Sequence, residues 1–105
     1  MSLGIEKNYI DQESSWSLQL NGEVDIYTAN DLKESLVEMY NERPENVKIN
    51  MEKLNYIDST GLGVLIGALK RLKTESKDIY IYNTKSNVRK IFNITGLDKI
   101  FKVEG

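Results

Sequence analysis

Alternating apolar and polar positions predict three strands in the chain. At 16–20, 47–51 and 79–82, Trp, Leu, Val, Ile or Met recurs at every second position. This period is typical of a strand that buries one face. Asn21-Gly22 interrupts the first pattern, and residues 52–58 are expected to connect the second strand to the next element.

Apolar residues recur at helical spacing in three further segments, 29–41, 59–73 and 86–96. Residues 4–10 can form a strand that pairs with its successor as a hairpin, and residues 100–103 form a last strand or an extended tail. The resulting order is β-β-α-β-α-β-α-β. It predicts an α/β fold in one domain, with a mixed, largely parallel sheet and right-handed crossover helices.

Polar residues mark the expected beginnings of the three helices. Thr28, with Asp31 three residues later, resembles a capping box at the first helix. Asp58 or Ser59 is the natural N-cap of the second helix, and Ser86 that of the third.

Two absent residue types exclude much catalytic chemistry. The 105 residues include no Cys and no His, which excludes disulfides, thiolate metal sites and Ser–His or Cys–His catalysis. Carboxylate chemistry, lysine chemistry or no chemistry remains. No segment has the pattern of a membrane span or a signal peptide, so we expect no membrane partner and a cytoplasmic location. The first three and last two residues are interpreted as possible cloning remnants.

The net charge of −2 is unevenly divided along the chain. Residues 1–45 hold ten acidic and three basic residues, a net −7, whereas residues 46–105 hold six acidic and eleven basic residues, a net +5. The asymmetry either orients a partner or a second copy, or is a chance property of two solvated faces. Because the basic residues at 70–77 have no interleaved aromatic residues, we expect no nucleic-acid partner.

The segment Asp58-Ser-Thr-Gly-Leu-Gly63 is the main candidate site. Ser59 stands at the expected start of a helix, where a serine commonly serves only as a cap. Free backbone N–H groups and the helix dipole also favour a phosphate at this position. Phosphorylation would add about −1.5 to −2 charges. Spacing alone leaves both a structural cap and a binding switch open.

Two other patterns carry less chemical information. Gly61, Gly63 and Gly67 miss the spacing of dinucleotide-binding and P-loop motifs. Gly63 and Gly67 lie one turn apart, which suits either close packing on the sheet or a smooth face toward a partner. Glu23 and Asp25 would share a face of an extended segment, but two carboxylates without further ligands are typical of a solvated turn.

Three motifs, at matching distances along nearly the whole chain, carry a resemblance to a known bacterial family. They are Gly22-Glu-Val-Asp25, Tyr56-Ile-Asp-Ser-Thr-Gly-Leu-Gly-Val-Leu-Ile-Gly67 after the strand at 47–51, and Phe92-Asn-Ile-Thr-Gly-Leu97. The chain resembles anti-sigma factor antagonists that consist of a single STAS domain. The fold of that family agrees with the predicted order of elements.

The resemblance implies a regulator rather than an enzyme. Such a protein binds an anti-sigma factor that is also a serine kinase of the GHKL ATPase type, and binding frees a sigma factor. The kinase phosphorylates a serine of the antagonist and the complex dissociates, while a PP2C-type phosphatase removes the phosphate. No cofactor or metal is expected in this chain, since ATP and Mg²⁺ would belong to the kinase.

By resemblance, Ser59 is the phosphoacceptor, which is also expected to remain a cap, and Asp25 is the acid that supports kinase recognition. The other residues that match positions at or near the partner surface are Asp58, Thr60, Gly61, Leu62, Gly63, Thr28 and Asn50. Some family members continue into a further helix, whereas this chain stops at Gly105. It is therefore either trimmed or a short member, and a role for that helix is left open.

Three other functions compete with this hypothesis. A STAS module without the phosphorylation switch, such as a scaffold or a transporter regulator, would have the same fold. A serine-dependent hydrolase would need Lys53 or Lys70 as its base, because no histidine exists. A nucleotide-binding domain would need glycine spacings that the chain lacks.

Overall fold

One five-stranded β-sheet organises the chain. The computed structural model describes residues 2–104. The elements are, in order, β1 (Leu3–Ile10), η1 (Asp11–Glu13), β2 (Ser15–Val24), α1 (Ala29–Glu42), β3 (Asn46–Ile57), α2 (Ser59–Lys73), β4 (Ile79–Tyr82), α3 (Ser86–Thr95), η2 (Leu97–Lys99) and β5 (Lys102–Val103). The predicted order of strands and α-helices is confirmed, with two short 3-10 helices, η1 and η2, in the connections.

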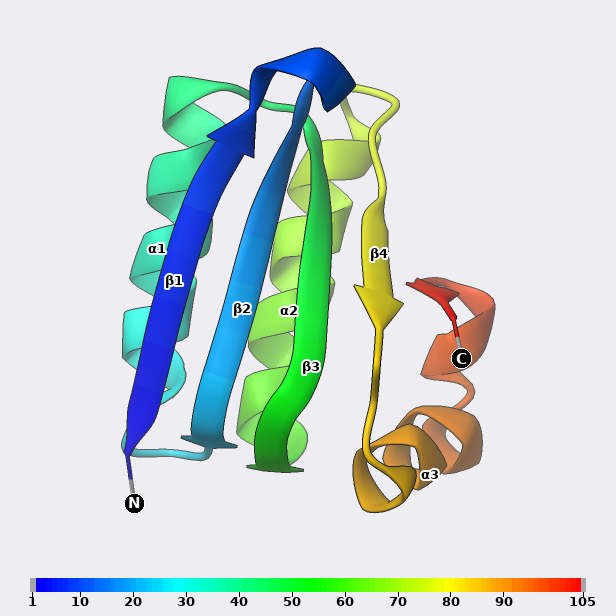
Figure 1. Cartoon of the computed structure of the whole chain (residues 1–105). Helices are drawn as coiled ribbons and strands as arrows, with labels where there is room; N and C mark the ends of the chain where they lie inside the picture. The colour runs from blue at the N-terminus through cyan, green and yellow to red at the C-terminus, as the bar shows by residue number, and fades with distance from the viewer. Residues whose placement is uncertain (1, 105) are drawn as a thin grey trace.

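The strands lie side by side in the order β1-β2-β3-β4-β5. β1 and β2 form an antiparallel hairpin, and each of the remaining neighbouring pairs is parallel. Figure 1 shows α1 and α2 next to each other behind the sheet, with α3 beside β4. The mixed, largely parallel sheet with helical crossovers that the sequence predicts is therefore confirmed.

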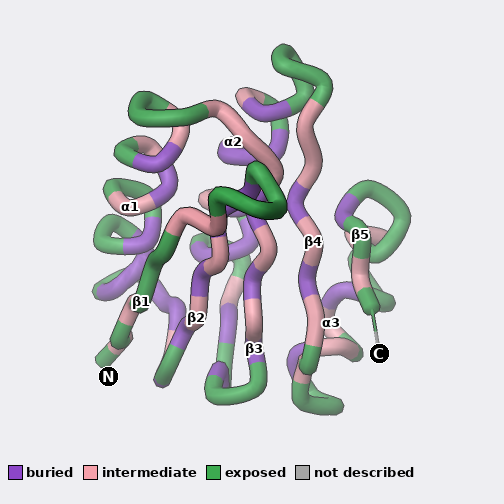
Figure 2. The backbone as a smooth tube through the Cα atoms, turned by 45° about the horizontal axis from the view of Figure 1, so that its top comes forward, coloured by how far each residue is buried: buried purple, intermediate pink, exposed green. Residues whose placement is uncertain are grey.

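The hydrophobic core lies between the sheet and its helices. Along β4, buried residues alternate with partly exposed ones, as the tube in Figure 2 shows. The apolar stripes of the helices cover the buried face of the strands. Burial of each large side chain contributes about 1.5–3 kcal/mol. The core includes Trp16, Leu18, Leu20, Leu32, Met39, Ile49, Met51, Leu65, Leu72, Ile79, Ile81 and Phe92.

Two strands are longer than their alternation predicts. β2 does not end at Asn21-Gly22 but continues to Val24, and β3 continues through the expected connection to Ile57. The register between these two strands shifts twice along this stretch. Both shifts insert an extra residue in β3, which breaks its period of two without ending the strand, whereas the buried positions of β2 keep alternating to Val24. Gly22 has a φ of 117°, a conformation that glycine adopts readily and other residues do not.

Two of the predicted helix caps are wrong. Thr28 makes no side-chain cap hydrogen bond at α1, so the capping box with Asp31 does not form; its hydroxyl is engaged in the preceding turn instead. Ser86 is the first residue of α3, after the N-cap residue Lys85, and is not itself the cap. The end of α3 is as predicted, because Gly96 adopts the left-handed conformation with φ 75°.

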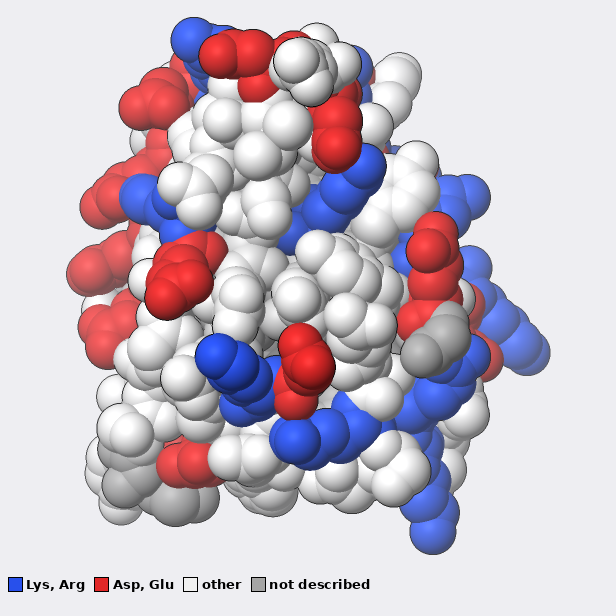
Figure 3. Space-filling model, in the orientation of Figure 1, with Lys and Arg blue, Asp and Glu red and all other residues white. Residues whose placement is uncertain are grey.

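Charge separates across the molecule. Figure 3 shows acidic side chains gathered along the edge where β1 and α1 lie, and basic side chains mainly toward α3 and β5. The unequal charge of the two halves of the sequence thus places acidic side chains on the side of β1 and α1 and basic side chains on the side of α3 and β5 (Figure 3). Among residues 2–104, no helix has the length and apolar character needed to cross a membrane.

We expect Gly22→Ala to destabilise the protein by more than about 1 kcal/mol. The φ angle disfavours alanine, and a Cβ at this position would lie 2.2 Å from the Ser2 carbonyl oxygen. Gly4→Ala in the paired strand is the control, because its Cβ would meet no atom closer than 3.6 Å. Urea unfolding measures the free energy of unfolding of both variants, and equal values would contradict this account of Gly22.

Candidate functional site

The ends of β2 and β3 bring two carboxylates to one edge of the sheet. Val24 and Ile57, the last residues of these strands, pair in register, and the Asp58 N–H donates to the Val24 carbonyl at 3.1 Å. Asp25 and Asp58 therefore begin two neighbouring turns, one leading into α1 and the other into α2 (Figure 1). The structure brings these predicted residues together although they are distant in sequence.

Asp58, rather than Ser59, caps α2. Asp58 Oδ1 accepts a hydrogen bond from the Gly61 N–H at 3.1 Å, and its backbone oxygen accepts one from the Leu62 N–H at 3.0 Å. Ser59 is the first helical residue and is exposed. Its hydroxyl makes no hydrogen bond to any residue between 2 and 104, so the prediction that it remains a cap is wrong. The hydroxyl is available to react or to bind a partner.

Asp25 is buried, which contradicts the expectation of a solvated turn for the Glu23–Asp25 pair. Only 6% of it is exposed, and its Oδ1 accepts hydrogen bonds from the Tyr27 N–H at 2.8 Å and the Thr28 N–H at 3.1 Å. The Thr28 hydroxyl accepts from the Asp25 N–H at 3.0 Å and donates to the Glu23 carbonyl at 2.8 Å. Asp25 and Thr28 therefore hold the β2–α1 turn. In the described part of the chain, no three His, Cys, Asp or Glu side chains form a group that could hold a metal ion.

Gly61 lets α2 approach the sheet closely. A Cβ at this position would lie 2.5 Å from Val24 Cγ1 and 2.8 Å from Ile57 Cγ1, far inside van der Waals contact. The next residue, Leu62, is buried in the core. Gly61 and Leu62, two residues of the predicted partner surface, therefore pack between α2 and the sheet and hold the start of the helix in place.

Thr60 and Gly63 lie on the outer side of α2, where both are exposed. A Cβ added to Gly63 would meet no atom within 4 Å, and one at Gly67 would approach only the end of the Arg71 side chain, at 3.9 Å. Close packing on the sheet, one of two explanations for this glycine pair, is therefore wrong. Ser59, Thr60 and Gly63 form the part of the segment that a partner can reach.

Asn50 lies elsewhere, in the middle of β3. It pairs in register with Gln19 and Tyr82. Its Oδ1 accepts a hydrogen bond from the Glu52 N–H at 3.0 Å and lies 3.4 Å from Asn83 Nδ2. The side chain supports the irregular part of β3, and the structure does not bring it to the edge that holds Asp25 and Asp58.

The sequence analysis missed two exposed apolar residues at this edge. Ile26 and Tyr27 form the turn after Asp25, with 65% and 80% of their surfaces exposed. The sequence does indicate that these two side chains are exposed, because they belong neither to the apolar alternation of the preceding strand nor to the apolar stripe of the following helix. They lie next to the turn that carries Ser59.

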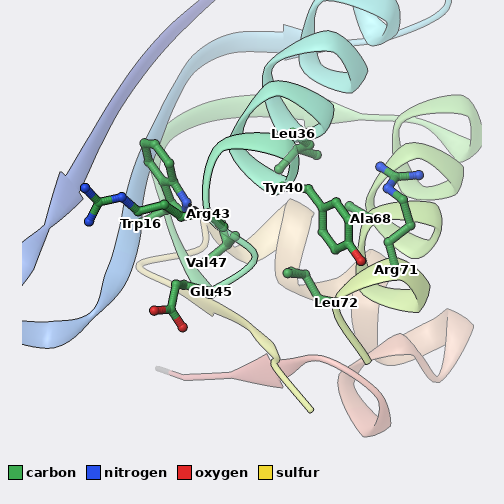
Figure 4. Close-up of a pocket in the computed structure, with 9 residues that line it drawn as sticks. All are labelled: Trp16, Leu36, Tyr40, Arg43, Glu45, Val47, Ala68, Arg71 and Leu72. Carbon is green, nitrogen blue, oxygen red and sulfur yellow. Dashed lines mark hydrogen bonds between the residues drawn. The ribbon is translucent and has the colours of Figure 1, made fainter. Parts of the chain in front are cut away.

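The crevice in Figure 4 is not a ligand site. It lies between α1 and α2, with Tyr40 and Arg71 on one side and Trp16 and Arg43 on the other. Its volume of about 10 Å³ is close to the least that a single water needs. The indole N–H of Trp16 is bound to the Arg43 carbonyl at 2.9 Å, so the crevice is part of the core packing.

An ion pair lies at the other end of β3. Lys48 Nζ donates to Glu13 Oε1 at 2.7 Å. This contact lowers the pKa of the Glu13 carboxyl and raises the pKa of the Lys48 ammonium. Both groups are open to solvent, and they are remote from the edge formed by Asp25 and Asp58.

Comparisons with known proteins find relatives over nearly the whole chain. The STAS domain family matches residues 9–105. A Staphylococcus epidermidis protein named anti-sigma-B factor antagonist is 37% identical over 103 residues, which cover 98% of this chain and 94% of that protein. The Staphylococcus aureus protein of the same name is 35% identical over equal shares of the two chains.

Solved structures show the same fold at lower sequence identity. An anti-sigma factor antagonist from Mycobacterium paratuberculosis superposes with a TM-score of 0.86 at 22% identity, covering 97% of this chain and 85% of that chain. The Bacillus cell fate determinant SpoIIAA, in its phosphorylated form, gives a TM-score of 0.75 at 19% identity, covering 97% of this chain and 92% of that chain.

Alanine at two neighbouring glycines should have opposite effects on stability. Gly61→Ala should destabilise by about 1–3 kcal/mol, because its Cβ collides with Val24 and Ile57. Gly63→Ala should stabilise by up to about 1 kcal/mol, because the site is open and alanine is the better helix former. Urea unfolding at equilibrium measures the free energy of unfolding of both variants. A shift of the same sign in the two variants would contradict the close approach at Gly61.

Proposed function

This chain belongs to the STAS domain family, and we propose on that basis that it is an anti-sigma factor antagonist. In its unphosphorylated form it binds an anti-sigma factor that is also a GHKL-type serine kinase, and so frees a sigma factor. The near-complete coverage of two relatives that carry this name supports the proposal. Control of a sigma factor would place the protein in the cytoplasm.

Ser59 is the proposed phosphoacceptor, and one observation carries the assignment. Its hydroxyl is exposed on the first turn of α2 and forms no hydrogen bond within residues 2–104, while Asp58 takes over the capping. A kinase can therefore reach the hydroxyl without opening the fold. SpoIIAA, which shares the fold, has been solved in a phosphorylated form. That is consistent with a fold that accommodates a phosphate.

The proposed switch acts on the partner surface rather than on the fold. The N-terminus of α2 favours negative charge, so the added phosphate is tolerated by the chain itself. At an interface, about two further negative charges beside Asp25 and Asp58 would add repulsion and a cost of desolvation. Each loss of about 1.4 kcal/mol weakens binding tenfold. A PP2C-type phosphatase would restore the binding form.

The structure gives little support to a serine hydrolase. Lys70 lies on the same helix as Ser59, and Lys53 lies on β3. At about 1.5 Å per residue, Lys70 lies about 16 Å along α2 from Ser59, and at about 3.3 Å per residue Lys53 lies about 13 Å before the end of β3. A general base must reach within hydrogen-bond distance of the hydroxyl. A STAS scaffold without the phosphorylation switch remains the competing function. A phosphorylation assay separates this scaffold from the proposed antagonist.

Incubation with ATP and the cognate anti-sigma factor kinase should add one phosphoryl group to the chain. The increment should be absent in Ser59→Ala and present in Thr60→Ala, the control at the neighbouring exposed hydroxyl. Intact-protein mass spectrometry measures the increment. Its absence from the unaltered chain, with a kinase active on another substrate, would indicate a phosphorylation-independent binding module.

Ser59→Asp should weaken binding to the same anti-sigma factor by at least about tenfold, because it places a carboxylate where the phosphate would stand. Ser86→Asp is the matched control, since Ser86 is the exposed first residue of α3. Isothermal calorimetry measures both affinities, and circular dichroism checks that both variants fold. Equal affinities would argue against a charge-sensitive interface at Ser59.

A further inference from the structure

Exposed large apolar side chains gather at the edge that carries Ser59. Ile26, Tyr27 and Tyr56 are three of the five such residues in the described chain; the other two are Ile94 and Ile100. Tyr56 lies near the end of β3, where it pairs with Glu23. Ile26 and Tyr27 lie in the turn after β2, which ends at Val24. Exposed apolar groups that cluster at one place indicate an interaction surface.

The turn that carries Ile26 and Tyr27 is held rigidly although both side chains are exposed. The buried Asp25 carboxylate accepts hydrogen bonds from the N–H groups of Tyr27 and Thr28. The Asp25 carbonyl accepts two more, from the N–H groups of Thr28 at 3.2 Å and Ala29 at 2.8 Å. A tip fixed in this way loses little conformational freedom when it binds, and such preorganisation favours affinity.

The tip and the proposed phosphoacceptor lie on adjacent turns. The Asp58 N–H is bound to the Val24 carbonyl, one residue before Asp25, so the segment 25–27 and the segment 58–60 leave the sheet side by side. A protein that closes over the Ser59 hydroxyl therefore meets Ile26 and Tyr27 at the same time. Tyrosine is enriched among the residues that dominate binding energy at protein interfaces.

We infer that Ile26 and Tyr27 are the apolar anchor through which the anti-sigma factor binds this chain, and that Asp25 is a positioning residue that holds the anchor in place. The inference rests on the proposed function and specifies it. The partner should offer an apolar pocket next to the site that receives Ser59. The resemblance implies that Asp25 itself supports kinase recognition; in this inference it acts through the turn instead, and its charge makes no essential contact with the partner.

The first test removes the anchor without disturbing the fold. Ile26→Ser/Tyr27→Ser should weaken binding to the anti-sigma factor by at least about 30-fold, because two exposed apolar side chains are lost while the backbone turn stays. Ile94→Ser is the matched control, since Ile94 is 73% exposed on α3, and its affinity should stay within about twofold of the unaltered chain. Calorimetry measures binding, and thermal unfolding checks stability.

The phosphorylation rate separates an anchor from a catalytic contact. In the double variant the KM for phosphorylation of Ser59 should rise, with kcat within about threefold at saturating substrate. Equal affinity of the double variant and the unaltered chain would overturn the inference and leave the proposed function intact. Failure of the unaltered chain to bind any anti-sigma factor kinase encoded beside it would instead overturn the proposed function, and the inference with it.

The role of Asp25 is tested by charge removal. Asp25→Asn keeps an oxygen that accepts from the Tyr27 and Thr28 N–H groups and should bind within about threefold of the unaltered chain. Asp25→Ala removes the acceptor and should weaken binding by at least about tenfold. Loss of binding in both variants, with Asp25→Asn still folded by circular dichroism, would assign Asp25 a direct ionic contact and overturn its role as a positioning residue.

Discussion

The parallel pairing of the last residues of β2 and β3 is the constraint on which the proposed site depends. It joins Val24 to Ile57 in register and extends into the hydrogen bond from Asp58 to the Val24 carbonyl. α2 can begin directly above this pair only because Gly61 has no side chain to collide with it. The start of α2, the β2–α1 turn and the exposure of Ser59 all follow from this contact.

Some of the polar side chains at this edge form hydrogen bonds that hold the fold, and others are free. Asp58 caps α2, and Asp25 with Thr28 satisfies the N–H groups of the β2–α1 turn. Both aspartates therefore accept hydrogen bonds from backbone N–H groups of the chain itself. Within residues 2–104, this network leaves the Ser59 hydroxyl free, and the exposed Thr60 hydroxyl beside it likewise. The Ser59 hydroxyl is free because Asp58, and not Ser59, caps α2.

The fold was largely predictable from the sequence, because the side chains that define it repeat with a regular period. Trp16, Leu18 and Leu20 alternate as expected, and the stripe of α2 matches its bounds. The two strand ends were not predictable. In β3, two register shifts beyond Asn50 break the alternation, and a period-based argument takes such a break for the end of a strand. In β2 the buried positions keep alternating to Val24, but Asn21-Gly22 is typical of a turn and masks the continuation.

The site was predictable in part, for a different reason. The motif around Ser59 identified the segment, but spacing could not decide between Asp58 and Ser59 as the cap, since either side chain can reach the N–H groups of the first turn. Burial of Asp25 depends on long-range packing and could not be foreseen from a pair of carboxylates two residues apart. Ile26 and Tyr27 were overlooked because their significance lies in being exposed, which no periodic pattern reports.

A switch built on this edge can change binding while leaving the core untouched. The core side chains beneath it, Val24, Ile57 and Leu62, are buried and apolar, and no polar group among residues 24–63 requires the Ser59 hydroxyl as a partner. A phosphate there would meet the positive end of α2 from the side of the chain, and a close-fitting surface from the side of the partner. The interaction of the phosphate with the N-terminus of α2 is favourable. Its interaction with the partner surface would lower the binding affinity. Phosphorylation of Ser59, as proposed, would therefore change the affinity for the partner without a second conformation of the chain.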